Sequence, residues 1–269
     1  MKQGQPKLLY GTSEVSLSFF NPGRSLVLPY LKDFSSFKKK RVKVLDLGCG
    51  VGSKADFIRS NYPDFTFYGC DISKKMIAQA KKRFPHIKFK ESHPEMLPYP
   101  NSFFDVVIAN SVLDHSRNPE KLVSEAHRVL KKGGLFLTAT PIEKDKSTLH
   151  GLFAGYSWYR NHRRKYCEHL HQFNKVDLRQ MFSVSGFRLV GEDYIWFYFS
   201  QFLDLIFYPI LALFGRPPGT SFSRFAESKN KYSIFRVVRN GISFIQNIEA
   251  TVFAHLPVGF FMYVKAVKK

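Results

Sequence analysis

The sequence predicts an α/β fold with a mostly parallel sheet, and three consecutive segments carry that prediction. An apolar strand at 42–47 runs straight into a turn that has glycine at every second position. Residues 53–60 then have the pattern of a helix, and a second apolar strand is expected at 65–70. Short apolar strands that alternate with helices are typical of parallel α/β domains.

The turn after the first strand indicates a ligand that approaches the backbone closely. It contains Gly48, Gly50 and Gly52, and glycine is needed where the backbone takes a positive φ or contacts a ligand. Asp71 ends the second strand 19 residues after Gly52. In α/β folds an acid at about this distance accepts hydrogen bonds from the ribose of a nucleotide cofactor. The alternative is a doubly wound domain that binds nothing at this turn.

Two further elements extend the pattern. A helix is predicted over 73–84, with Ser73 as its N-cap. A fourth strand is predicted over 106–109 and ends in Asn110. Ligands of open α/β sheets lie beyond the carboxyl ends of the strands. We therefore expect Asn110 and the residues up to His115 to lie between a cofactor and an acceptor.

Two runs farther along the chain resemble one family. LPYPNSFFDVV at 97–107 and RVLKKGG at 128–134 resemble the runs before the fourth and fifth strands of class I S-adenosylmethionine-dependent methyltransferases of the methyltransferase-11 type. The resemblance covers about residues 42–190. It implies a Rossmann-like methyltransferase fold, with a seven-stranded, mostly parallel sheet and helices on both faces. It also implies S-adenosylmethionine as the cofactor and methyl transfer by direct displacement at the sulfonium carbon.

The resemblance assigns cofactor contacts to eight residues along the chain: Asp46, Gly48, Gly50, Gly52, Asp71, Ile72, His93 and Asn110. One position departs from the family. Where the family has an acid for the adenine amino group, this chain has His93 followed by Pro94. A neutral histidine can accept a hydrogen bond, whereas proline has no N–H to donate. Glu91 and Glu95 are the alternative partners for the adenine.

Two histidines are candidate catalytic residues. His115 could take a proton from an acceptor hydroxyl, because an imidazole titrates near neutral pH; capping of local backbone is the alternative. His169 belongs to a basic segment after the fifth strand, which we expect to overhang the site and to hold a phosphate or carboxylate of the acceptor. A solvated surface is the alternative there. The segment comprises Tyr159, Arg160, His162, Arg163, Arg164, Lys165, Tyr166, His169 and His171.

The sequence predicts no metal site. His169 and His171 form a His-x-His pair, but no carboxylate or cysteine at metal-ligand spacing accompanies them. Cys49, Cys70 and Cys167 stand in unrelated contexts and form no pairing or metal pattern. The first two are expected to be small apolar fillers near the cofactor turn.

The chain divides into a core and two additions. We expect the methyltransferase core at 42–198 and 257–269, with a closing strand at 258–267. Residues 1–41 are expected to form an N-terminal lid. Residues 199–256 are predicted to be a hydrophobic, basic, helical insertion between the last two strands.

The insertion begins with an apolar run whose polar and helix-breaking residues leave too little to span a membrane. Gln201, Asp204 and Pro209 interrupt it, and a span needs about 20 apolar residues. A second, amphipathic helix is predicted over 234–254. We expect the insertion to rest on an anionic membrane surface, or alternatively to form an intramolecular lid or a homodimer contact. In either case it would line an apolar pocket for a small, amphipathic or lipid-linked acceptor.

The net charge of +20 narrows the classes of partner. Anionic membranes and nucleic acids both attract such a charge, but no RNA-binding module accompanies it. The start of the chain has no apolar run of a signal peptide, so we expect a cytoplasmic protein, peripheral on the inner face of the membrane. The rival functions are an RNA or protein methyltransferase that uses the basic surface, and a non-catalytic protein of the same fold.

Overall fold

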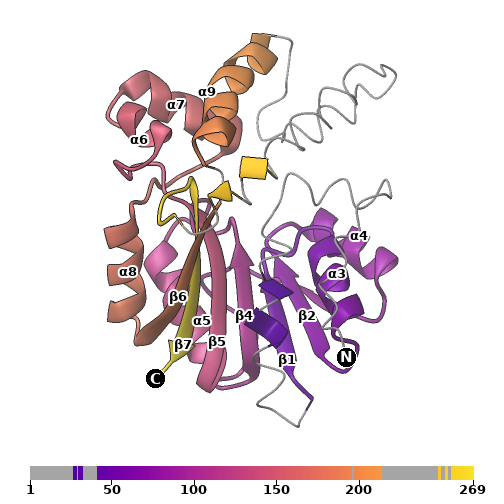
Figure 1. Cartoon of the computed structure of the whole chain (residues 1–269). Coiled ribbons are helices and arrows are strands. Elements are labelled where there is room, and N and C mark those ends of the chain that lie inside the picture. Colours follow the sequence, from indigo (N-terminus) through magenta and orange to yellow (C-terminus); the bar gives the residue numbers. More distant parts are fainter. Residues whose placement is uncertain are drawn as a thin grey trace, which may run out of the picture.

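The computed structural model describes residues 27–28, 30–32, 41–195, 197–213, 248–249, 252–253 and 256–269. Its seven strands are β1 (Lys43–Leu47), β2 (Thr66–Asp71), β3 (Lys88–Glu91), β4 (Phe104–Asn110), β5 (Leu130–Pro141), β6 (Phe187–Ile195) and β7 (Phe261–Lys268). They form one sheet of order β3-β2-β1-β4-β5-β7-β6 (Figure 1). β7 runs in the direction opposite to the other six strands, which are parallel to one another. The predicted mostly parallel, seven-stranded sheet is thus confirmed.

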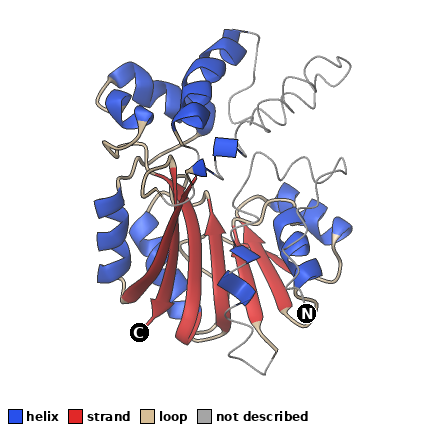
Figure 2. Ribbon diagram, in the orientation of Figure 1, coloured by secondary structure: helices blue, strands red, loops and turns tan. Residues whose placement is uncertain are grey.

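Helices cover both faces of the sheet (Figure 2). The helices on the faces are α3 (Ser53–Asn61), α4 (Lys74–Arg83), α5 (Pro119–Val129) and α8 (Lys175–Val184). The other helices are α6 (Leu149–Phe153), α7 (Ser157–Cys167) and α9 (Tyr198–Leu213). Side chains of α5 and α8 share one buried cluster with Val107 of β4, and side chains of α3 and α4 share another with Val106. Successive residues of a strand point to opposite faces, which is why adjacent valines serve separate cores.

The helix starts follow local chemistry that the sequence carries. Ser73 caps α4, since its hydroxyl accepts from the N–H of Met76 at 3.3 Å. Asn118 caps α5 in the same way, and Pro119 occupies its first turn. These caps fix the points at which the chain leaves β2 and β4, and both points lie at the carboxyl edge of the sheet.

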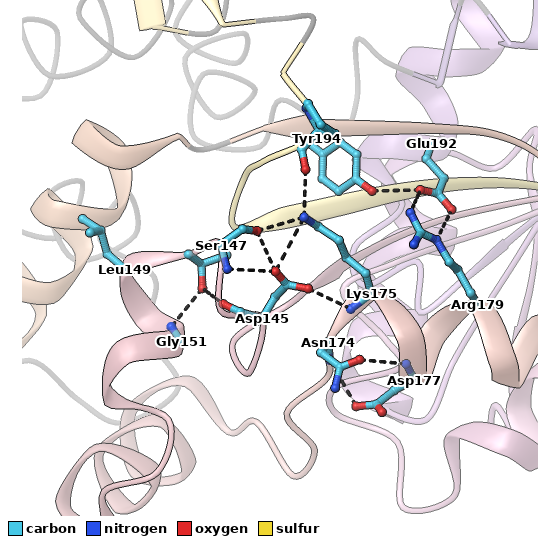
Figure 3. A network of polar contacts seen from close by, with 12 residues as sticks. Asp145, Ser147, Leu149, Gly151, Asn174, Lys175, Asp177, Arg179, Glu192 and Tyr194 are labelled. Atoms are coloured by element: carbon cyan, nitrogen blue, oxygen red, sulfur yellow. Dashed lines mark hydrogen bonds and ion pairs between the residues drawn. The ribbon is translucent and has the colours of Figure 1, made fainter.

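A polar network fastens the chain between β5 and α8 (Figure 3). The ammonium of Lys175 donates to the Ser147 hydroxyl and to the Pro257 carbonyl, each at 2.8 Å. It also lies 3.5 Å from the carboxylate of Asp145. The network therefore joins the loop after β5, the start of α8 and the approach to β7. Helices α6, α7 and α9 lie together beyond the carboxyl edge of the sheet (Figure 1).

Some expectations fall outside the described residues. Most of the expected lid at 1–41 and most of the helix expected at 234–254 lie there. The chain leaves β6 and enters α9 near residue 198, where the insertion was expected to begin, and the division into core and insertion stays a prediction. Among the helices of the described ranges, none combines the length and the apolar character needed to cross a membrane.

Candidate active site

A cavity of about 520 Å³ opens where β1, β2, β3 and β4 end. Its walls come from the turns after these strands and from the segment after α7. Five of the eight predicted cofactor residues line it: Gly48, Gly50, Asp71, Ile72 and His93. The candidate base His115 lines it as well. Because parallel strands place their carboxyl ends at one edge, four distant turns meet at this site.

The three positions in the turn after β1 hold glycine for different structural reasons. All have positive φ, at 69° for Gly48, 54° for Gly50 and 80° for Gly52. A Cβ on Gly48 would lie 2.6 Å from Val112, and one on Gly52 would lie 2.6 Å from Phe89. A Cβ on Gly50 would meet nothing within 4 Å. Gly48 and Gly52 thus permit close packing, whereas Gly50 leaves the cavity open.

Asp71 is held in place by the backbone on both sides. Its Oδ2 accepts from the N–H of Gly50 and its Oδ1 from the N–H of Ser73, both at 2.9 Å. Each carboxylate oxygen has a further lone pair. Asp71 can therefore accept hydrogen bonds from two ribose hydroxyls without losing the contacts that orient it.

Three of the predicted cofactor residues do not line the cavity. Asp46 is fully buried in β1, where its carboxylate lies 2.7 Å from the ammonium of Lys54 at the start of α3. Asn110 is buried at the end of β4, and Gly52 packs against Phe89. Asp46 and Asn110 thus belong to strands that lead to the cavity, and Gly52 closes the turn as the N-cap of α3.

The adenine end of the predicted site is bounded by Ile72 and His93, which are both exposed in the cavity wall. Glu95 also lines the cavity, but its Oε1 accepts from the Ser116 hydroxyl at 2.6 Å and from the N–H of Arg117 at 3.0 Å. Partial burial opposes ionisation of Glu95, yet these hydrogen bonds keep its pKa below the usual value. Glu95 therefore secures the turn before α5.

The two candidate catalytic histidines meet at a third residue, Asp114. The Asp114 Oδ2 lies 3.4 Å from Nε2 of His115 and 3.3 Å from Nε2 of His169. Asp114 is fully buried, and neither of its carboxylate oxygens receives a hydrogen bond of normal geometry from the described residues. We call Asp114, His115 and His169 the histidine cluster.

The outer nitrogen of each histidine is also occupied. Nδ1 of His115 lies 2.9 Å from the backbone oxygen of Glu168, and Nδ1 of His169 lies 2.8 Å from Oε1 of Glu143. Glu143 is completely buried and pairs with Arg163 at 2.5 Å. Burial opposes its ionisation, but Arg163 and His169 hold the pKa of Glu143 well below its ordinary value. The backbone oxygen of Glu168 and the carboxylate of Glu143 can only accept hydrogen bonds, so Nδ1 of His115 and Nδ1 of His169 must donate.

The sequence prediction missed Asp114 and Glu143. A signal for them existed, since each acid follows the end of a parallel strand by a few residues. Their meeting with His169 required the path of the chain after α7, which no sequence pattern specifies.

The basic segment divides between two roles. Arg160, Arg164, His169 and His171 line a second cavity, of about 720 Å³, which adjoins the first at Leu170. Other members of the segment turn inward, and Tyr159 and Arg163 are buried. The segment thus contributes both to an open basic wall and to the support of the histidine cluster.

A family model described as "Methyltransferase domain" matches residues 45–138. That range contains the glycine turn, Asp71 and the cavity walls after β3 and β4. Residues 45–138 form a class I methyltransferase domain. The family and the fold of this methyltransferase domain imply S-adenosylmethionine as its cofactor.

Relatives match the methyltransferase domain over part of their lengths. A probable S-adenosylmethionine-dependent methyltransferase of Mycolicibacterium smegmatis is 35% identical over 98 residues, which are 36% of this chain and 37% of that protein. A malonyl-[acyl-carrier protein] O-methyltransferase of Herminiimonas arsenicoxydans is 34% identical over 121 residues, 45% of this chain and 44% of that protein. The match therefore spans less than half of each relative.

Solved structures resemble this chain in fold. A putative sarcosine dimethylglycine methyltransferase from Galdieria sulphuraria has a TM-score of 0.60 at 14% identity, covering 93% of this chain and 86% of that one. The YcgJ protein of Bacillus subtilis has a TM-score of 0.57 at 18% identity, covering 93% and 99%. At such identities the likeness concerns the fold alone.

Proposed function

We propose that this protein transfers a methyl group from S-adenosylmethionine to a small acceptor. The observation that carries the proposal is the oriented carboxylate of Asp71 beside the open turn at Gly50, both in the wall of one cavity. The ribose would lie at Asp71 and the adenine near Ile72 and His93. Asp46, Asn110 and Gly52 would support this cofactor site from behind.

The reaction is a direct displacement. A lone pair of the acceptor attacks the methyl carbon, the bond between that carbon and the sulfonium sulfur breaks, and the electron pair of that bond stays on sulfur. The products are the methylated acceptor and S-adenosylhomocysteine. An acceptor hydroxyl also gives up its proton, and we assign that task to the histidine cluster, with His115 and His169 as catalytic candidates. His115 is the member that reaches the cofactor cavity.

We further propose an amphipathic or lipid-linked acceptor, reached at or near an anionic membrane surface. Large apolar side chains are exposed on the helices beyond the carboxyl edge of the sheet or at the N-cap of α7: Leu152, Tyr156, Trp158, Tyr198, Phe202 and Ile206. The same helices carry Arg160 and Arg164 in the wall of the second cavity. Apolar side chains flanked by basic ones are suited to an interface with anionic lipid. Names of relatives, such as trans-aconitate 2-methyltransferase, support a small acceptor.

The cofactor assignment is tested by calorimetric titration of S-adenosylmethionine into the full chain. We expect binding, and we expect Asp71→Ala to weaken it by about 1–3 kcal/mol through loss of ribose hydrogen bonds. Asp64→Ala, at an exposed acid in the loop before β2, is the matched control and should leave the affinity unchanged. Absence of binding by the unaltered chain would favour the non-catalytic alternative. Equal affinities of the two variants would remove Asp71 from the site.

A further inference from the structure

We propose that the histidine cluster binds a divalent transition-metal ion through Oδ2 of Asp114, Nε2 of His115 and Nε2 of His169. This inference revises the sequence expectation of no metal, because the missing carboxylate comes from Asp114, 55 positions before His169. It deepens the proposed function, and it rests on that function where it concerns the acceptor.

The spacing of the three atoms fits a tetrahedral ion. Metal bonds to imidazole nitrogen and carboxylate oxygen are about 2.0–2.2 Å, which gives about 3.3 Å between neighbouring ligands of a tetrahedron. The Asp114 oxygen lies 3.3 Å from His169 Nε2 and 3.4 Å from His115 Nε2. One possible ligand atom from each of the three residues lies within 4.8 Å of those of the other two. Small rotations of the two imidazole rings would bring the remaining distance, between Nε2 of His115 and Nε2 of His169, to the tetrahedral value.

The tautomers of the histidines favour a cation at this point. Glu168 O and the Glu143 carboxylate can only accept, so Nδ1 of each ring carries a hydrogen. In the neutral form of each ring, Nε2 then presents a lone pair. Two such lone pairs face a buried carboxylate oxygen, and like partial charges would repel there. A cation between them removes that repulsion, whether it is a metal ion or a proton.

The outer contacts match those of metal-binding histidines. Such histidines usually donate their second N–H to a carboxylate or a backbone carbonyl, which fixes the ring and its tautomer. His169 has the carboxylate of Glu143, and His115 has the carbonyl of Glu168. The backbone also holds the two halves together, since the Asp114 carbonyl accepts from the N–H of Leu170 at 2.8 Å.

The local charge balance points the same way. Arg163 compensates Glu143 within the buried shell. Asp114 is then a fully buried carboxylate between two imidazoles, and a buried charge is costly unless it is paired or coordinates a metal. A divalent ion would supply that compensation.

Three protein ligands would leave a coordination position for a further oxygen, as in catalytic metal sites. His115 borders the cofactor cavity and His169 borders the second cavity, so the ion would lie between the two. We infer that the acceptor binds there through a hydroxyl or enol oxygen. A bound ion would occupy the Nε2 lone pairs of His115 and His169, so in the metal-bound form these histidines would not act as bases. The metal would instead lower the pKa of the acceptor group, and the released proton would pass to water.

The test measures metal binding without cofactor or acceptor. The full chain is dialysed against a chelator and titrated calorimetrically with Zn²⁺, and Co²⁺ is added separately to record its visible absorption bands. We expect one site per chain and the bands of tetrahedral Co²⁺. Asp114→Asn and His169→Gln should each weaken Zn²⁺ binding by about 100-fold or more. His86→Gln is the control, because His86 and Asp56 form a histidine–carboxylate pair at 2.9 Å with an exposed ring.

Affinity for S-adenosylmethionine is measured on the same variants to show that they are folded. Failure of the unaltered chain to bind Zn²⁺ or Co²⁺ would overturn the inference. So would an affinity in Asp114→Asn and His169→Gln equal to that in His86→Gln. Metal binding without cofactor binding would instead count against the proposed function alone.

Discussion

The backbone N–H of Gly50 donates to the carboxylate of Asp71 across 2.9 Å, and so joins the turn after β1 to the end of β2. Gly48 extends the junction, since its N–H donates to the carbonyl of Cys70 at 2.8 Å. These hydrogen bonds therefore fix the position of the turn relative to Asp71 before a cofactor binds. Preorganisation of this kind reduces the ordering cost of binding.

Gly50→Val should abolish binding of S-adenosylmethionine. The φ of 54° disfavours a branched residue, and its side chain would extend into the open cavity. Gly133→Val is a matched control, because Gly133 has a φ of 70° and open space around a Cβ, yet lies outside the cavity wall. We expect both variants to lose similar stability in urea unfolding. Calorimetry should find lost affinity in Gly50→Val only; equal affinities would mean that the turn does not contact the cofactor.

Lys175→Met should lower the free energy of unfolding by about 1–3 kcal/mol. The substitution leaves the hydroxyl of Ser147 (Figure 3) without its charged donor. The carbonyl of Pro257 loses the same donor. Lys132→Met, at an exposed lysine in β5, is the control and should change stability little. Urea unfolding of both variants provides the measurement. A Lys175→Met protein as stable as the control would show that the network contributes nothing net.

Glu143 should make the fold sensitive to acid. Its pKa is depressed in the folded protein, so it contributes stability above its unfolded pKa of about 4.3 and loses that contribution as the pH falls below it. Glu143→Gln should cost about 3–5 kcal/mol at neutral pH, because the buried Arg163 loses its partner.

The same substitution should also flatten the loss of stability between about pH 4.3 and pH 2. Glu91→Gln, at an exposed carboxylate, serves as the control. Unfolding curves recorded across this pH range decide the matter. A Glu143→Gln variant with the acid dependence of the unaltered chain would refute the assignment.

Phe202→Glu with Ile206→Glu should reduce binding to anionic vesicles by about tenfold or more. Both side chains are exposed on α9, at 52% and 40%, and a carboxylate there opposes insertion among anionic lipids. Val176→Glu is the control, because Val176 is exposed on α8, which lies on a flank of the sheet (Figure 1), and it lines neither cavity. Co-sedimentation with phosphatidylserine vesicles gives the affinities. Indifference to vesicles, with steeply salt-dependent binding to RNA, would favour the RNA methyltransferase alternative.

The sequence predicted the fold well because hydrophobic pattern and local chemistry agree in the core. The strand expected at 65–70 became β2, and the helix expected at 73–84 became α4 with its Ser73 cap. The contacts of Asp46, in contrast, could not be predicted from the sequence pattern. The motif contains it, but only the structure shows that Lys54 pairs with it away from the cavity wall.

The histidine cluster was less accessible to prediction for a physical reason. Asp114 and His115 are neighbours in the chain, whereas α5, β5, α6 and α7 separate them from His169 in the sequence. Spacing rules detect ligands that share one helix or one turn. They do not detect His169, which is placed by the backbone hydrogen bond from the N–H of Leu170 to the carbonyl of Asp114.

The place of β7 in the sheet favours one order of assembly during folding. Strands β1 to β4 come from residues 43–110, so the cofactor side of the sheet can form from one continuous stretch of chain. β6 pairs with β7 in the sheet, although 65 residues separate the end of β6 from the start of β7. Pairings between segments so far apart form slowly. We therefore expect the part of the sheet that borders the cofactor cavity to form early in folding. The other edge is completed when β7 pairs with β5 and β6.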